Sequence, residues 1–468
     1  MLDNLNSVTI NGGVFTQHNS TMASSLSVEA FARLQQAVVP GAFHNSGERF
    51  DPPKCHPRTR LAVTERIRNW ILGKESTNSF IMWLNGSAGA GKSAIAQRIA
   101  ELCHEDELLA SIFFSKSDPR RNHLNFLFPT IAYQIACAIP AARSGIEQEI
   151  IRDPLIFTRN LEAQMIALVV KPLQPLVDSG YFSDPASSPR LIIIDGLDEV
   201  VDRQAQTKIL EAVSNILRCH RLPLIFLIAS RPEQEIMYAF STQPLAQLSV
   251  RLPLDHNFHP DDDIRIFLDD SFSEIKAEHP RRNLIPSSWP TAAVMGSLVY
   301  KASGQFIYAA TIIRFIKSLR HRPVDRLEII LGIRPVLRDM PFGELDALYM
   351  HILSALEDPD RTLLIIGVIL AQGPGGAISK ISNIEKFLGL DAGDGEFLLA
   401  DMTSLLSLEN GTVCMLHASF GDFLFDPARS GTFSVDRTAV HTTMAYHCIR
   451  RLNGASRDDS LAEGNTAH

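Results

Sequence analysis

The chain has 468 residues, more than one compact core usually holds, so we expect about two to four domains. Hydrophobic residues make up 45% of the chain and charged residues 21%, an ordinary balance for a globular protein. The net charge of −8 disfavours nucleic acid as a partner, while leaving room for a local basic patch. The longest apolar stretch, residues 363–371, is far shorter than a membrane span, so we expect no membrane association.

Cysteine usage and the start of the chain both favour a cytoplasmic location. The six cysteines form no Cys-x-x-Cys pair and no His/Cys cluster, a pattern typical of reduced thiols rather than of disulfides or a zinc site. Residues 1–6 lack the basic region and apolar core of a signal peptide.

The first 255 residues are predicted to lead into and form an α/β domain. Residues 1–50 are polar and are predicted to be a flexible N-terminal region, with a small hairpin at residues 8–15 as the alternative and a candidate short helix at residues 30–39. Residues 51–78 are predicted to be a Pro-rich linker followed by a helix at 64–72. Over residues 79–255, short apolar runs alternate with helical patterns, which predicts a parallel sheet with helices on both faces. The expected strands are 80–84, 109–114, 191–194 and 224–229, and the expected helices are 95–103, 124–139 and 161–170, the last ended by the prolines that follow it.

Beyond residue 255 the strand signals fade, and two further subdomains are predicted. Residues 256–335 are expected to be a helical subdomain, with helices at 261–268, 291–302 and 306–319. In residues 336–450, helices at 345–356, 361–370 and 396–405 precede short strands around Leu406 and Val413, the order of a winged helix. Residues 451–468 are predicted to be a disordered tail.

The strongest chemical signal is a glycine-rich segment between the strand at 80–84 and the helix at 95–103. It matches G-x-x-x-x-G-K-[ST], the P-loop pattern, whose glycines let backbone N–H groups surround phosphate oxygens. Lys92 is expected to reach the β- and γ-phosphates and Ser93 to ligate Mg²⁺. The alternative is a glycine turn with no chemical role. The predicted phosphate-binding residues are Gly86, Ser87, Ala88, Gly89, Ala90, Gly91, Lys92 and Ser93.

Two more apolar strands end in polar residues that suit the same site. Asp195 follows the strand at 191–194 and is predicted to hold Mg²⁺ directly or through water. Asp198 or Glu199 is a candidate general base, the alternative being loop solvation or a helix N-cap. Arg231 follows the strand at 224–229 and is placed to stabilise charge on the γ-phosphate, the alternative being a surface salt bridge.

Together, FIMWLNGSAGAGKS, LIIIDGLDEV and FLIASRPE resemble the NACHT domain of the STAND class of signalling P-loop NTPases, most closely its fungal members. Over roughly residues 50–430, CHPRTR, FFSKSDPRRN, SGQFIYAATIIRFI and LHASFGDFLFD add to the resemblance. It implies a nucleotide-dependent switch, locked by ADP, opened by ATP, self-associating when open, and active in innate-immunity-like or self/non-self signalling through an unknown protein partner. It further implies that His417 touches the β-phosphate and that Thr59 and Arg60 lie near the nucleobase. The C-terminal repeat array common in this family has no counterpart in this sequence.

Several functions stay open at this stage. Besides a slow switch NTPase, the motifs allow a non-hydrolysing nucleotide-binding scaffold, a P-loop kinase or a DNA-remodelling ATPase of the AAA class. The sequence has no Asn-Lys-x-Asp segment for reading guanine, so ATP/ADP with Mg²⁺ is the expected ligand and GTP remains possible.

Overall fold

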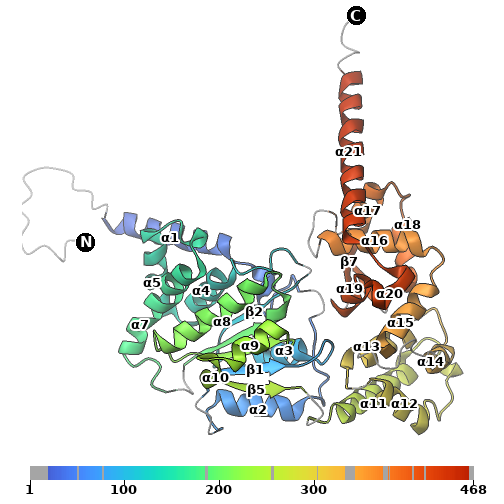
Figure 1. Ribbon diagram of the computed structural model, residues 1–468, viewed down its shortest axis with the longest axis horizontal. Helices are drawn as coiled ribbons and strands as arrows, with labels where there is room; N and C mark the ends of the chain where they lie inside the picture. The colour runs from blue at the N-terminus through green and yellow to red at the C-terminus, as the bar shows by residue number, and fades with distance from the viewer. Residues whose placement is uncertain are drawn as a thin grey trace, which may run out of the picture.

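The computed structural model describes residues 19–49, 52–75, 79–116, 118–184, 188–254, 258–302, 304–332, 343–372, 378, 380–402, 405–415 and 418–462. Its first module is built on a parallel sheet of five strands in the order β2-β3-β4-β1-β5 (Figure 1). Four of the strands are buried along their whole length, as a sheet covered on both faces requires. The strands are β1 Ile81–Asn85, β2 Leu108–Phe113, β3 Leu191–Asp195, β4 Ile225–Ser230 and β5 Ser249–Pro253.

Alternate side chains of β1, β2, β3 and β4 enter two separate hydrophobic cores. On one face, Met82 and Leu84 of β1 pack with α2 and α3; on the other, Ile81 and Trp83 pack with the remaining helices. The fold class predicted from the sequence, a P-loop NTPase sheet with helices on both faces, is confirmed. The helices of this module are α1 Asn19–Ala37, α2 Leu61–Ile71, α3 Lys92–Cys103, α4 Leu127–Ala138, α5 Pro140–Arg152, α6 Leu161–Met165, α7 Lys171–Asp178, α8 Arg203–Arg218, α9 Gln234–Ser241 and α10 Leu245–Leu248.

The N-terminal region differs from its prediction. Instead of a flexible region over residues 1–50, the structure has α1 packed on α5 and α4, with Ala30 and Leu34 buried in the core. The correction concerns residues 19–49, because the preceding residues lie outside the described part of the chain. The sequence gives little sign of this packing because α1 has only a few apolar residues. Apolar side chains along one stripe of a helix are nevertheless enough to bind it to a larger core.

A second difference concerns the prolines after residue 170. The sequence predicts that they end the helix, but the helical path continues through a π-helical turn at Ile166–Val170 into α7. Pro172 stands at the beginning of α7, where its missing N–H costs no hydrogen bond. The edge strand β5 and helix α8 were not among the predicted elements; β5 lacks a continuous apolar run because its side chains are only partly buried.

The second module is helical and shares one hydrophobic core from Ile264 to Val440. Helices α16, α17 and α18 precede the antiparallel hairpin β6–β7, and Lys380 bridges to Thr412 of β7. This is the helix–helix–helix–strand–strand order of a winged helix, as the sequence predicts. The elements are α11 Pro260–Glu278, α12 Ala292–Ala302, α13 Phe306–Ile316, α14 Pro323–Gly332, α15 Gly343–Ser354, α16 Pro359–Gln372, α17 Ile381–Leu388, α18 Asp394–Leu399, β6 Leu406–Glu409, β7 Thr412–Met415, α19 Ala418–Leu424, α20 Pro427–Ser430 and α21 Arg437–Ala462.

The chain's last helix, α21, corrects the predicted disordered tail. It runs from Arg437 to Ala462, so residues 451–462 are helical rather than irregular. Its first part packs on α16 and α17, and the remainder projects away from both modules (Figure 1). Across the described residues, every helix is too short or too polar to cross a lipid bilayer.

Candidate functional site

The sheet order brings the predicted site residues to one edge. Strand β4 lies between β1, which leads into the P-loop, and β3, which ends at Asp195. Because all five strands are parallel, their carboxyl ends meet at the same edge. Arg231 follows β4 directly and therefore stands between the P-loop and the acidic segment.

The P-loop has the backbone conformation that phosphate binding needs. Gly89 and Gly91 have φ values of +75° and +92°, and Gly91 is the N-cap of α3. Its position leaves the first N–H groups of α3 without a side-chain cap among the described residues, so they are free to bind an anion. The Lys92 Nζ donates to the carbonyl oxygens of Gly86 and Ser87 at 2.8 and 2.9 Å, which holds the ammonium over the loop.

Asp195 and Ser93 form a pair that suits Mg²⁺. Asp195 is 4% exposed, its carboxylate is hydrogen-bonded by the Ser93 side chain, and its Oδ1 has no hydrogen-bond partner among the described residues. Burial raises the pKa of Asp195 to about 6, against the opposing effects of Ser93, Arg49 and Lys92. One carboxylate and one hydroxyl fit Mg²⁺, which usually takes few protein ligands and completes its shell with water and phosphate oxygens. Within the described part of the chain, no group of three or more His, Cys, Asp or Glu side chains is arranged to hold a metal ion.

The two acids after Asp195 have different surroundings. Asp198 accepts a hydrogen bond from the backbone N–H of Arg231 at 2.9 Å and pairs with its Nε at 3.2 Å. Glu199 instead accepts a hydrogen bond from the backbone N–H of Lys116 at 3.0 Å. Burial, with a further contribution from Asp198, raises the pKa of Glu199 to about 7. The carboxylate of Glu199 is thus the one of the two that is not committed to a cation.

Arg231 joins the two modules. Its Nη2 donates to Asp422 of α19 at 3.0 Å while its Nε faces Asp198, so one guanidinium contacts a carboxylate from each module. The Lys116 Nζ lies 3.9 Å from the other oxygen of Asp422. The indole N–H of Trp83 donates to Ser230 at 2.8 Å, which fixes the strand end from which Arg231 emerges.

The helical module also covers the P-loop. Arg60, which is 4% exposed, donates from Nη2 to the carbonyl of Ala90 at 2.8 Å and lies over the ring of Phe306. Its backbone N–H bonds Asp263, and its Nε and Nη1 are buried without hydrogen-bond partners among the described residues. A Cβ added at Gly89 would meet Ile307 at 2.3 Å. The P-loop is therefore packed against Ile307 of α13, and Arg60 links the loop to Asp263 of α11.

The structure gathers most of the predicted residues and adds others. The P-loop residues, Asp195, Asp198, Glu199 and Arg231 share one edge of the sheet, whereas His417 lies outside the described residues. Sequence reasoning missed Asp422 and Lys116. Asp422 stands within LHASFGDFLFD and Lys116 within FFSKSDPRRN, two segments that contribute to the family resemblance. Nothing in the local sequence distinguishes these two residues from ordinary surface charges.

Comparisons with known proteins find one family model that matches part of the first module. Residues 59–231, less than half of the chain, match the family described as Nephrocystin 3, N-terminal. The matched stretch includes the P-loop, Asp195 and Arg231. No curated protein matches the chain.

Solved structures that align with most of this chain include the following two. Cdc6p from Pyrobaculum aerophilum is 12% identical, with a TM-score of 0.32 covering 86% of this chain and 98% of that one. A chain of Drosophila ORC bound to DNA is 14% identical, with a TM-score of 0.33 covering 81% and 97%. TM-scores of this size assign no partner to this chain, so the expectation that it binds no nucleic acid stays a prediction, as does the NACHT resemblance.

Proposed function

We propose that this chain is a nucleotide-dependent switch that binds ATP with Mg²⁺ and hydrolyses it slowly. The observation that carries the proposal is that Arg231 pairs with two carboxylates, Asp198 in the sheet module and Asp422 in the helical module. A cation beside the phosphate site is thereby also the link between two modules. Any change in the charge that Arg231 faces alters the free energy of that link.

Nucleotide binding would use the backbone of the P-loop together with Lys92, Mg²⁺ and Arg60. The N–H groups at the beginning of α3 and the Lys92 ammonium would bind the β- and γ-phosphates. Ser93 and Asp195 would hold Mg²⁺, which supplies charge neutralisation for the triphosphate. Arg60 is buried against Ala90, and its Nη1 has no hydrogen-bond partner among the described residues, so it would contribute to the nucleotide contact on the side of the helical module.

Hydrolysis would use Glu199 as the general base. Its pKa of about 7 matches the optimum for removing a proton from water near neutral pH. Asp198 would act on Arg231 rather than on water, because it already accepts two contacts from that residue. Arg231 would then stabilise the charge that develops on the transferred phosphoryl group.

The switch would follow from competition for Arg231. A γ-phosphate near Arg231 offers a stronger anion than the Asp422 carboxylate, so ATP would weaken the contact between modules and ADP would leave it intact. The NACHT resemblance adds self-association of the open form, cytoplasmic signalling of an innate-immunity-like or self/non-self kind, and a protein partner of unknown identity.

The test begins with the purified chain. We expect it to contain bound ADP, and to elute as a larger species with a non-hydrolysable ATP analogue than with ADP. Lys92→Ala should lower the affinity for labelled ATP by about 10- to 100-fold, since it removes charged hydrogen bonds to phosphate. Lys208→Ala, which removes an exposed charge on α8, is the matched control. Wild-type affinity in Lys92→Ala would overturn the assignment of the site.

Four further measurements separate the alternatives. Glu199→Gln should abolish most of the turnover, whereas an unchanged rate would favour a non-hydrolysing scaffold. Turnover that requires a second substrate would favour a kinase, and turnover stimulated by DNA would favour a remodelling ATPase. Competition between ATP and GTP for the labelled site decides which nucleobase is preferred.

A further inference from the structure

We propose that the loop after β2 positions Glu199 for hydrolysis, and that the N-terminal segment at residues 40–49 holds this loop in place. The loop is defined here as residues 114–116 and 118–122. The inference deepens the proposed function and rests on it, because it concerns the orientation of the general base. Within it, Asp118 and Arg120 are positioning residues.

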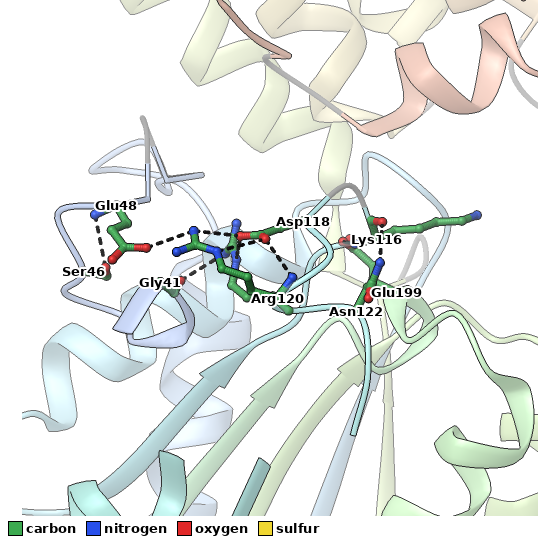
Figure 2. A network of polar contacts seen from close by, with 9 residues as sticks. Gly41, Ser46, Glu48, Lys116, Asp118, Arg120, Asn122 and Glu199 are labelled. Atoms are coloured by element: carbon green, nitrogen blue, oxygen red, sulfur yellow. Dashed lines mark hydrogen bonds and ion pairs between the residues drawn. The ribbon is translucent and has the colours of Figure 1, made fainter. Parts of the chain in front are cut away.

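The loop contacts the acidic segment at two points. The backbone N–H of Lys116 donates to Glu199 Oε2 at 3.0 Å (Figure 2), and Oε1, which accepts no hydrogen bond from the described residues, is the oxygen that would accept a proton from water. The N–H of Val201 donates to the carbonyl of Asn122 at 2.9 Å, and the Asn122 amide in turn donates to the carbonyl of Lys116 at 3.3 Å. The loop therefore contacts the segment at Glu199 and again two residues later, which fixes the place of the Lys116 N–H.

The loop is held in its own shape by Asp118, which is only 1% exposed. Its carboxylate pairs with Arg121 Nε at 2.8 Å and accepts the backbone N–H of Arg120 at 3.0 Å. The N–H of Ser115 donates to the carbonyl of Arg121 at 3.0 Å, closing the loop beside Lys116. Removing a buried partner of this kind costs more than the pair itself contributes, because the remaining charge is left unpaired.

The N-terminal segment completes the arrangement. Arg120 Nη2 lies 3.0 Å from Glu48 Oε2 (Figure 2). Arg121 Nη1 donates to the carbonyl of Gly41 at 3.1 Å. The segment itself is fixed on the sheet module, since Ala42 is fully buried and the His44 N–H donates to Ser111 at 3.1 Å. A continuous set of contacts thus runs from residues 40–49 through the loop to the carboxylate of Glu199. Movement of the N-terminal segment would displace the Lys116 N–H.

The sharpest test removes only the amide. Lys116→Pro lacks the backbone N–H, whereas Lys116→Ala keeps it and loses only the side chain. We expect kcat to be about tenfold or more lower in the proline variant than in the alanine variant, with KM for ATP within about threefold. We also expect the acid limb of the pH–rate profile to move to higher pH in the proline variant, because a hydrogen bond that favours the charged carboxylate is lost.

The contacts that hold the loop are tested with two variants whose expected effects differ in size. Asp118→Asn should lower kcat more than Glu48→Ala, since the Asp118 pair is buried and the Glu48–Arg120 pair is about half exposed. Arg120→Lys keeps the charge opposite Glu48 and should recover activity relative to Arg120→Ala. In hydrogen-exchange mass spectrometry, a slowly exchanging amide in the 114–122 peptide should become fast in Asp118→Asn.

The outcomes separate this inference from the proposed function. If the wild-type chain hydrolyses ATP and kcat is equal in Lys116→Pro and Lys116→Ala, the inference is overturned and the proposed switch stands. If the wild-type chain does not hydrolyse ATP, the proposed reaction is overturned. The hydrogen-exchange rate of the Lys116 amide then decides whether the loop is held as described. If Lys116→Pro fails to bind ATP, the kcat and exchange of Asp118→Asn decide in its place, and wild-type values for both overturn the inference.

Discussion

Asp422 of α19 and Arg231 at the end of β4 are 191 residues apart in the sequence, yet their side chains meet at 3.0 Å. Because Arg231 also faces Asp198 at 3.2 Å, the guanidinium is shared by two carboxylates from different modules. Both partners are about one third exposed, so water and salt weaken the pair without abolishing it. Under the proposed function, a change in nucleotide charge would be sufficient to open a link of this strength.

The first prediction concerns this link. Asp422→Asn should speed the release of labelled ADP about two- to fivefold, corresponding to the loss of a partly exposed ion pair. The rate is measured by stopped flow at low and high salt, and high salt should reduce the difference between variant and wild type. Asp360→Asn, an exposed acid at the beginning of α16, controls for the loss of one negative charge. Equal release rates in Asp422→Asn and wild type would mean that the pair does not hold the modules together.

The second prediction concerns pH. With a pKa of about 7, Glu199 becomes the effective base as pH rises from 6 to 8, so the hydrolysis rate should rise with a midpoint near 7. Its pKa in the folded chain lies above its ordinary value of 4.5, so the folded chain binds this proton more tightly than the unfolded chain does. The free energy of unfolding should therefore fall as pH rises from about 4.5 to about 7.

Glu199→Gln isolates that contribution to stability. The variant should raise the melting temperature at pH 8 and leave it nearly unchanged at pH 4.5, with a gain of about 1 kcal/mol in a partly hydrated site. Glu211→Gln on the exposed face of α8 is the control. A stabilisation that is the same at both pH values would contradict a raised pKa for Glu199.

The third prediction concerns the contact between the P-loop and the helical module. Gly89→Ala combines a positive φ with a Cβ that would lie 2.3 Å from Ile307 Cγ2, so it should destabilise the chain by about 2–4 kcal/mol. Gly73→Ala has a similar φ of +66° but no neighbour within 4 Å, and should cost about 1 kcal/mol. Thermal unfolding compares the two. A difference near zero would show that α13 does not press on the loop in solution.

The fourth prediction concerns Mg²⁺. Ser93→Ala removes a hydroxyl beside the unpartnered oxygen of Asp195, so it should weaken binding of ATP in the presence of Mg²⁺ by about tenfold and change binding in EDTA much less. Ser87→Ala removes an exposed hydroxyl from the same loop and should leave the Mg²⁺ dependence unchanged. Calorimetric titration with and without the metal provides the measurement, and parallel losses in both conditions would argue against Ser93 as a ligand.

The strands and most helices were predictable because their signals are local. Continuous apolar runs such as residues 191–194 mark strands buried on both faces, and the glycines before Lys92 mark a turn that few other residues can adopt. The exceptions were elements stabilised from outside themselves. Helix α1 has few apolar positions and binds through Ala30 and Leu34 to a core built elsewhere. Strand β5 is recognisable only beside β1.

The sequence by itself determined the phosphate loop, the acid at the end of β3 and the arginine after β4, because each depends on residues adjacent in the chain. The tertiary structure decided which acid stays uncommitted, since only the fold places Arg231 against Asp198 and the Lys116 amide against Glu199. It also brought Asp422 and Glu48 to the neighbourhood of the site. The physical reason is range: backbone conformation is set by neighbours a few residues away, whereas charge pairing depends on distances that only packing fixes.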